Sequence, residues 1–302
     1  MALTLQTTET KAPLRVETWR LLTGFGISGP LNMAIDEALL DSVIAGGVPV
    51  VRFYTWQPAT LSLGTNQALG EIDRVACEAR GFGLVRRLTG GRAVLHQHEL
   101  TYSVIAREND PRVSGGVVES YRKISAALVD GLQALGASVS LAAPDRALLR
   151  AMSVRRAVAL DEAGGTVEDS GAVCFDAASA YELTAGGKKL VGSAQARRGG
   201  ALLQHGSILL DIDWDAWVSV FAYASEAGKR RAYTKLPERM TSLRHEFGRP
   251  VTPEEALSAL VSAFETRLHV SLGPATLDPL EEATALKLAA EKYGSEEWTG
   301  RK

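Results

Sequence analysis

Two long stretches of the chain have apolar residues at helical spacing. In residues 30–45 the apolar positions recur every three or four residues, after Ser28 and Pro30 and ahead of a pair of glycines. Proline fits the first turn of a helix, where its missing N–H group is not needed. Residues 117–135 show the same amphipathic spacing. Both stretches are therefore predicted to be helices.

Shorter runs rich in β-branched and aromatic residues predict strands between the helices. Residues 50–56 and 60–63 are separated by Pro58, which predicts a hairpin. Residues 84–88 form a strand that breaks at a Thr-Gly-Gly turn, and residues 100–106 return from that turn. The remaining predicted elements of this half are a short helix, 72–79, and the strands 137–141, 181–183, 189–196 and 201–210.

The C-terminal part is predicted to be helical. Thr252 to Glu255 form a capping box with proline at the first helical position, and Asp278 to Glu281 repeat the device more weakly. Residues 272–278 form a polar spacer, and residues 145–171, rich in charged residues and glycine, are predicted to be a mobile loop. Strands and helices mix without strict alternation, which predicts an α+β fold with a mixed β-sheet flanked by helices.

Composition limits the classes of function. With 302 residues, 46% of them hydrophobic, the chain can form one large core or two modest ones. A formal net charge of -2 gives no broad basic field, so we expect no nucleic acid partner. No run of about 18 apolar residues and no signal-like start occur, so we expect a cytoplasmic protein without a membrane partner.

A glycine pair and three arginines are concentrated in residues 86–96, RRLTGGRAVLH. Glycines allow the backbone to approach a ligand, and arginines suit an anionic group such as a phosphate or pantetheine arm. The segment matches neither the Walker pattern nor GxGxxG. From the residues alone, a tight turn with solvated arginines is an equally good interpretation.

The two cysteines differ in their surroundings. Cys77 lies within the apolar pattern of a predicted helix, whereas Cys174 follows the predicted mobile loop, which favours Cys174 for reactivity. A cysteine nucleophile acts as the thiolate and needs a cation nearby, for which Lys188, Lys189 and His205 are candidates. A lone cysteine is nevertheless more often a small buried apolar residue. Neither cysteine belongs to a Cys/His cluster, so no disulfide framework and no metal site are expected.

Alternation along a strand sends Lys188 and Lys189 to opposite faces, and periodicity does not settle which lysine enters a site. Three histidines, His96, His98 and His205, border the glycine-containing segments, and a general base could be among them. None of the three is assigned that role by its spacing.

Four ordered motifs resemble the biotin/lipoate protein ligase superfamily, and within it the octanoyl-acyl carrier protein:protein N-octanoyltransferases of the LipM type. They are NMAIDEA from Asn32, RFYTW with TLSLG, RRLTGGRAVLHQHELTYSV from Arg86, and GKKLVGSAQARRGGALLQHGSILLDID from Gly187. The ending Lys292-Tyr293-Gly294-Ser295 with Trp298 is similar too. The motifs run in family order from Trp19 to Asp213, so they are far more specific than a single glycine loop.

The resemblance implies roles for two residues. Cys174 would take an octanoyl group from acyl carrier protein as a thioester, and Lys189 would lower the thiol pKa and orient the acyl carbonyl. The acceptor would be a lysine of a glycine cleavage H protein or of an E2 lipoyl domain, and no cofactor would be needed. The residues implied to surround the acyl and pantetheine pocket are Arg86, Thr89, Gly90, Gly91, Arg92, Ala93, His96, Gly192, Ser193, Ala194, His205 and Gly206.

Two related activities remain as alternatives. One is an ATP-dependent lipoate-protein ligase, although such relatives have a third glycine where this chain has Arg92 and do not need a cysteine at position 174. The other is an octanoyl amidotransferase that moves the group between lipoyl domains. The implied domain organisation is an N-terminal extension, 1–18, a biotin/lipoate ligase-like catalytic domain, 19–250, and a C-terminal helical region packed on it, 251–302.

Overall fold

The computed structural model describes residues 15–142 and 182–301. The predicted mobile loop, 145–171, and Cys174 lie outside the described residues. Within the described parts every helix falls short of the length and apolar character that crossing a membrane would require.

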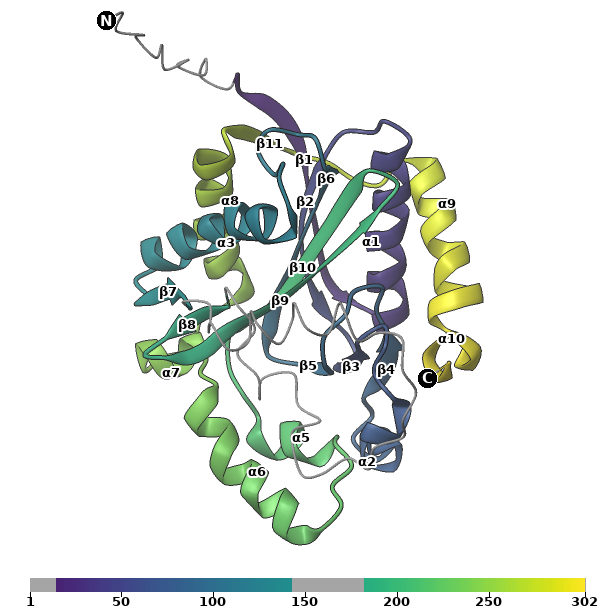
Figure 1. The fold of residues 1–302 in the computed structure, drawn as a ribbon, viewed down its shortest axis with the longest axis vertical. Helices are drawn as coiled ribbons and strands as arrows, with labels where there is room; N and C mark the ends of the chain where they lie inside the picture. Colours follow the sequence, from purple (N-terminus) through teal and green to yellow (C-terminus); the bar gives the residue numbers. More distant parts are fainter. Residues whose placement is uncertain (1–14, 143–181, 302) are drawn as a thin grey trace, which may run out of the picture.

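An eight-stranded mixed sheet forms the centre of the fold (Figure 1). Its order is β11-β1-β2-β6-β10-β9-β8-β7, with β1 parallel to both of its neighbours and the other pairs antiparallel. The predicted α+β fold with a mixed sheet is therefore confirmed. The strands are β1 Glu17–Ile27, β2 Val50–Trp56, β6 Glu99–Arg107, β7 Val139–Leu141, β8 Leu183–Ala185, β9 Lys188–Arg198, β10 Ala201–Leu209 and β11 Val270–Pro274.

A second sheet of three strands corrects two predicted pairings. In it β3, Thr60–Leu63, lies between β4, Gly83–Arg86, and β5, Val94–His96. The predicted hairpin of β2 with β3 is wrong because both edges of β2 are already occupied, by β1 and β6. The predicted return of β6 beside β4 is also wrong, since the short strand β5, which the pattern did not reveal, comes between them and pairs with β3.

Helices cover both faces of the large sheet (Figure 1). The predicted helices α1, Gly29–Ile44, and α3, Val117–Ala134, are confirmed. On one face α1 packs with α9, Pro279–Leu288, and on the other α3 packs with α8, Pro253–Leu268. The remaining helices of the described residues are η1 Leu69–Glu71, α2 Arg74–Ala79, α5 Trp214–Ser219, α6 Glu226–Arg239, α7 Leu243–Phe247, η2 Ala289–Tyr293 and α10 Glu296–Gly300.

Strand β2 shows why its sequence is almost continuously apolar. Val51 and Phe53 pack in the cluster under α3 and α8, whereas Val50 and Tyr54 pack in the cluster under α1. A strand covered on both faces has no solvent side on which polar residues would be placed. The same covering places the polar side chain of Arg52 in the interior, which requires buried partners for it.

The two C-terminal caps are formed in the opposite order of strength from the prediction. At α9, Asp278 accepts a hydrogen bond from the Glu281 amide at 2.8 Å and its own amide donates to the Glu281 carboxylate, which completes the capping box. At α8, the Thr252 hydroxyl accepts from the Glu255 amide, but the Glu255 carboxylate binds Arg249 instead. The predicted spacer at 272–278 begins inside β11, the edge strand of the large sheet.

The C-terminal ending folds back onto the first helix and onto β4. Lys292 and Tyr293 both bind the buried Glu37 carboxylate of α1, with Nζ and Oη each 2.7 Å from Oε2. The indole of Trp298 donates to the Arg86 carbonyl at 2.8 Å. The motif at the end of the chain therefore fixes α10 against the sheet that carries the 86–96 loop.

Candidate active site

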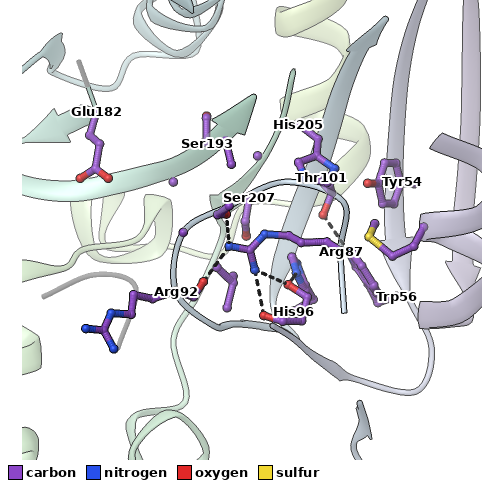
Figure 2. A pocket seen from close by; sticks show the side chains of 18 residues that line it. Tyr54, Trp56, Arg87, Arg92, His96, Thr101, Glu182, Ser193, His205 and Ser207 are labelled. Carbon is purple, nitrogen blue, oxygen red and sulfur yellow. Dashed lines mark hydrogen bonds between the residues drawn. The ribbon is translucent and has the colours of Figure 1, made fainter. Parts of the chain in front are cut away.

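A cavity of about 200 Å³ lies between the small sheet, β9 and β10, and side chains from α1 and β2 close one side of it (Figure 2). Met33, Tyr54 and Trp56 give that side an aromatic and apolar surface, and Val94 of β5 adds an apolar group from the small sheet. Hydroxyl, imidazole and carboxylate groups line the rest. The other described residues that line it are Ser62, Arg87, Gly90, Gly91, Arg92, His96, Thr101, Glu182, Gly192, Ser193, Ala194, His205, Gly206 and Ser207.

The structure brings nine of the twelve predicted pocket residues to this cavity. They come from two segments far apart in the sequence, the 86–96 loop and the β9-β10 hairpin, which is what the ordered motifs indicated. The nine residues are Gly90, Gly91, Arg92, His96, Gly192, Ser193, Ala194, His205 and Gly206.

The other three predicted residues do not line the cavity. Arg86 is fully buried, and its guanidinium donates to the carbonyls of Gly64 at 2.8 Å and Thr299 at 2.7 Å. Ala93 packs in the apolar cluster beneath the small sheet. Thr89 lies behind the cavity wall, where its hydroxyl meets His205 Nε2 at 2.7 Å. All three residues therefore support the cavity wall from behind and do not contact the cavity itself.

The predicted anion-binding role of the arginine-rich loop is not what the arginine contacts favour. Arg87, which is buried, donates to the carbonyls of Ser62, Gly90 and Arg92 at 2.7 to 2.9 Å, and these bonds hold the loop closed (Figure 2). Arg92 is half exposed and forms an ion pair with Glu71 at 2.7 Å. Arginines thus shape this turn, because its backbone carbonyls have no strand partners to satisfy them.

Asp36 of α1 is the centre of a buried polar cluster beside the cavity. Its Oδ1 accepts from Arg52 at 2.8 Å and from Ser103 at 3.0 Å. Its Oδ2 accepts from the Tyr54 hydroxyl at 2.9 Å and lies 3.1 Å from His205 Nδ1. Burial opposes ionisation, but the His205 hydrogen bond and the Arg52 charge outweigh it, so the pKa of Asp36 is lowered.

This carboxylate determines which nitrogen of His205 carries the proton. An ionised carboxylate only accepts hydrogen bonds, so Nδ1 of His205 donates to Asp36. With a neutral ring, Nε2 is then an acceptor, and the Thr89 hydroxyl donates to it. Asp36, His205 and Thr89 therefore form a continuous hydrogen-bonded chain from α1 to the 86–96 loop.

A second cluster fixes the aromatic side of the cavity. The Trp56 indole donates to the Thr101 hydroxyl at 2.8 Å, and Thr101 donates to the buried Glu99 carboxylate at 2.7 Å. Ser207 donates to the other Glu99 oxygen. His96 stacks on Trp56, with ring centroids 4.0 Å apart and an interplanar angle of 14°.

Burial lowers the pKa of His96 below 6.5, even though Glu99 acts in the opposite direction. A depressed histidine pKa stabilises the fold at pH values above 6.5, and that contribution is lost as the pH falls through the folded-state pKa. We expect the free energy of unfolding to decrease between pH 7 and pH 5, and the decrease to be smaller in His96→Asn. Urea unfolding at half-unit pH intervals measures this. An unchanged slope in the variant would show that other groups produce the pH dependence.

The two candidate lysines on β9 differ in burial and in their partners. Lys189 is buried, with 5% of its side chain exposed, and its ammonium forms an ion pair with the Glu182 carboxylate, which is 3% exposed. Lys188 is half-buried on the opposite face and donates to the Pro237 carbonyl at 2.8 Å. Glu182 borders the cavity, so the ion pair places the Lys189 ammonium at its edge. Periodicity left this choice open, and burial distinguishes the two side chains.

Cys77 is buried in α2, as its apolar surroundings in the sequence indicated. Burial, with a smaller effect from Asp73, raises the pKa of its thiol to about 11, so at neutral pH it is protonated and a poor nucleophile. Cys174 lies outside the described residues, and its role remains a prediction.

Gly64, at the end of the TLSLG motif, lies directly against the 86–96 loop. A Cβ at this position would be 1.8 Å from the Gly91 carbonyl oxygen, whereas a Cβ at Gly70 would meet nothing within 4 Å. Gly64→Ala is therefore expected to displace Gly90 and Gly91, to destabilise the protein by about 1–3 kcal/mol and to reduce activity at least tenfold. Thermal unfolding and initial rates measure both effects. Gly70→Ala is the matched control, and an equal loss in both variants would contradict this explanation.

Nine of the cavity-lining residues were not predicted individually. Eight of them lie inside motifs that carry the resemblance: Met33, Tyr54, Trp56, Ser62, Arg87, Val94, Thr101 and Ser207. The ninth, Glu182, immediately precedes β8. Tyr54, Trp56, Ser62, Thr101 and Ser207 share one signal in the sequence, which is a polar or aromatic residue within an otherwise buried strand.

Within residues 15–142 and 182–301 no three of the His, Cys, Asp and Glu side chains are arranged to hold a metal ion. The histidines of the cavity instead bond to neighbouring side chains, His205 to Asp36 and Thr89 and His96 to Ser62, and Glu182 pairs with Lys189.

Residues 28–265 match the family described as the lipoyl protein ligase A/B catalytic domain. The chain is 44% identical to Octanoyltransferase LipM of Kyrpidia tusciae over 95% of this chain and 100% of that one. It is 42% identical to the protein of that name in Lysinibacillus sphaericus, over 94% of this chain and 99% of the other.

Solved structures give the same assignment of fold. A bipartite lipoate protein ligase from Thermoplasma acidophilum, described together with its E2 lipoyl domain, superposes with a TM-score of 0.75 at 25% identity, over 94% of this chain and 96% of that one. A lipoate-protein ligase A bound with ATP superposes with a TM-score of 0.70 at 26% identity, over 95% and 99% of the two chains.

Proposed function

The chain belongs to the lipoyl protein ligase A/B catalytic domain family, and from that premise we propose that it is an octanoyltransferase of lipoate biosynthesis. The relatives that cover nearly its whole length, at 39–44% identity, carry that activity in their names. It is an acyltransferase that modifies lipoyl domains. Its acyl donor is octanoyl-acyl carrier protein, and its acceptors are an H protein or an E2 lipoyl domain.

The reaction proceeds in two acyl transfers. The Cys174 sulfur attacks the thioester carbonyl of the donor, a new sulfur–carbon bond forms, and the bond to the pantetheine sulfur breaks, with that thiol taking the proton. The amine of the acceptor lysine then attacks the enzyme thioester, forms an amide and releases the Cys174 thiol. No ATP is consumed, because the donor thioester is already activated.

The observation that carries this proposal is the cavity with an aromatic and apolar side and the Lys189–Glu182 ion pair at its edge. Met33, Tyr54 and Trp56 offer an octanoyl chain a surface that excludes water. An ammonium at the edge of such a cavity stabilises a thiolate and the negative charge that develops on the acyl oxygen. Glu182 holds the Lys189 side chain in place through their ion pair.

Intact mass spectrometry tests the acyl-enzyme step. The protein is incubated with octanoyl-acyl carrier protein without ATP, and a single octanoyl adduct that hydroxylamine removes is expected. Cys174→Ala should lose this adduct, while Cys77→Ala, the matched control, should keep it. An adduct that persists unchanged in Cys174→Ala would refute the assignment of the nucleophile.

The same incubation distinguishes the two alternatives. Modification of a lipoyl domain that requires ATP and free lipoate would identify a lipoate-protein ligase, the activity of the structural neighbour bound with ATP. Acylation from an octanoylated H protein, but not from acyl carrier protein, would identify an amidotransferase. Acylation from the carrier protein without ATP supports the octanoyltransferase.

A further inference from the structure

The cavity of the candidate site runs across the strands of the large sheet. Its lining residues on that sheet come in turn from β2, β6, β10 and β9, and Glu182 precedes β8, which is the order of these strands in the sheet. One end of the cavity therefore lies at β2, and the other lies at the ion pair of Glu182 with Lys189. Figure 2 shows this separation, with Glu182 at the left of the view and Tyr54 and Trp56 at the right.

Buried side chains close the cavity at its β2 end. Tyr54 and Trp56 of β2 and Met33 of α1 belong to one apolar cluster, and each is at most 6% exposed. The residue before Met33 holds this turn of α1 on β2, because the Asn32 side-chain amide donates to the Thr55 carbonyl at 3.2 Å. Met33 therefore lies beside the two rings at the closed end of the cavity.

Met33 differs from the two rings because polar contacts do not fix its side chain. The Tyr54 hydroxyl donates to Asp36 at 2.9 Å, and the Trp56 indole donates to Thr101 at 2.8 Å, so both rings are held in place. Methionine is unbranched, fills irregular space and offers only a weak hydrogen-bond acceptor. A change in the size of Met33 therefore alters the length of the cavity without breaking the hydrogen bonds that position the rings.

The distance between the two ends of the cavity matches an eight-carbon chain. Strands β6 and β10 lie between β2 and β9, so three spacings of about 4.8 Å separate β2 from β9, roughly 14 Å in all. An extended octanoyl group has seven carbon–carbon bonds of about 1.5 Å, and its zigzag spans about 9 Å. With its carbonyl carbon beside Lys189 of β9, its terminal methyl would stop about one apolar contact distance, 4–5 Å, from β2. A chain two carbons longer would overlap the side chains that close this end.

We propose that Met33 limits the length of the acyl chain that the enzyme transfers. The chain lies across β9, β10 and β6, with its carbonyl at the Lys189 end and its terminal methyl against the Met33 side chain. This inference rests on the proposed function for the acyl thioester. Each methylene buried against an apolar wall strengthens binding about fourfold, so a change of two carbons in the available length has a measurable effect on selectivity.

A competition between acyl donors tests the role of Met33. The protein is incubated briefly with an equimolar mixture of hexanoyl-, octanoyl- and decanoyl-acyl carrier protein, and intact mass spectrometry measures the three adducts. The ratio of decanoyl to octanoyl adduct should rise at least tenfold in Met33→Ala, which lengthens the cavity. The ratio of hexanoyl to octanoyl adduct should rise about tenfold in Met33→Phe, which shortens it. A general loss of stability would not shift the two ratios in opposite directions of chain length.

The matched control is Leu39→Ala, which makes a similar deletion on the same helix. Leu39 is fully buried in the same apolar cluster as Met33 but is not among the described residues that line the cavity. Its variant should lose thermal stability and keep the wild-type ratios of the three adducts. Unchanged ratios in both Met33 variants would overturn the proposal. So would the same shift towards decanoyl in Leu39→Ala, because the effect would then come from looser packing of α1.

Thermal unfolding with free fatty acids separates this proposal from the proposed function, because it needs no acyl transfer. Octanoate should raise the Tm of wild type more than an equal concentration of decanoate does, and the order should reverse in Met33→Ala. A wild-type protein that forms no adduct from any of the three donors is not an octanoyltransferase of this kind, and the Tm shifts then decide the role of Met33 separately. Adducts that form with the same ratios in every variant would refute the role of Met33 alone.

Discussion

Lys189→Met is expected to reduce kcat/KM for octanoyl transfer by about 10²- to 10³-fold, the usual loss when one group that stabilises a developing oxyanion is removed. It should also destabilise the protein by about 3–5 kcal/mol, because the buried Glu182 carboxylate loses its ion-pair partner. Initial rates with saturating acceptor and urea unfolding at pH 7 measure the two effects.

The double variant Lys189→Met/Glu182→Gln separates catalysis from stability. Removing both charges abolishes the cost of a buried carboxylate without its cation, so much of the lost stability should return. Activity should not return, since the ammonium is still absent. If Lys189→Met transferred octanoyl at the wild-type rate, the proposed role of the lysine would be refuted. If the double variant regained activity together with stability, the effect of Lys189 would be structural.

Lys188→Met is the natural comparison for both variants. Its ammonium contacts the Pro237 carbonyl on the other face of β9 and does not meet Glu182 in the described contacts. We expect an activity within a few-fold of wild type. The difference between two adjacent lysines would then follow from the alternation of side chains along the strand.

The helices could be predicted from the sequence because their signals are local. The spacing of apolar residues and the flanking Ser28, Pro30 and glycines mark α1 at both ends within a residue or two. Strand pairing depends on residues far apart, and nothing in residues 50–63 shows that β1 and β6 occupy both edges of β2. The predicted hairpin is wrong because a turn between two neighbouring strands does not determine which strands pair.

The candidate site could likewise be predicted only in part. Ordered motifs predicted that the 86–96 loop and the β9-β10 hairpin meet, and both line the cavity. The motifs could not show that Arg86 binds the Thr299 carbonyl more than two hundred residues away. Nor could they show that Asp36 and His205, 169 positions apart, share a hydrogen bond. A side chain's role here depends on which distant backbone or carboxylate it reaches.

Asp36→Asn should destabilise the protein by about 3–5 kcal/mol at pH 7, and reduce activity about tenfold or more. Arg52, 2% exposed, would lose its carboxylate partner in the interior, although its bonds to Asn32 would remain. An amide in place of the carboxylate also brings an NH₂ group toward four donors, so the proton on His205 Nδ1 is no longer fixed. Urea unfolding and initial rates measure the two losses.

The pH dependence of the stability that Asp36→Asn loses identifies the cause of that loss. The folded-state pKa of Asp36 is lowered from 3.8, so its stabilising contribution is present above pH 4 and disappears as the pH falls through the folded value. The difference in unfolding free energy between wild type and Asp36→Asn should therefore be constant from pH 7 to pH 5 and shrink below pH 4. Asp41→Asn, which removes an exposed partner of Arg198, should cost less than about 1 kcal/mol. A difference that stayed constant down to pH 3 would mean that shape, and not the buried charge, makes Asp36 important.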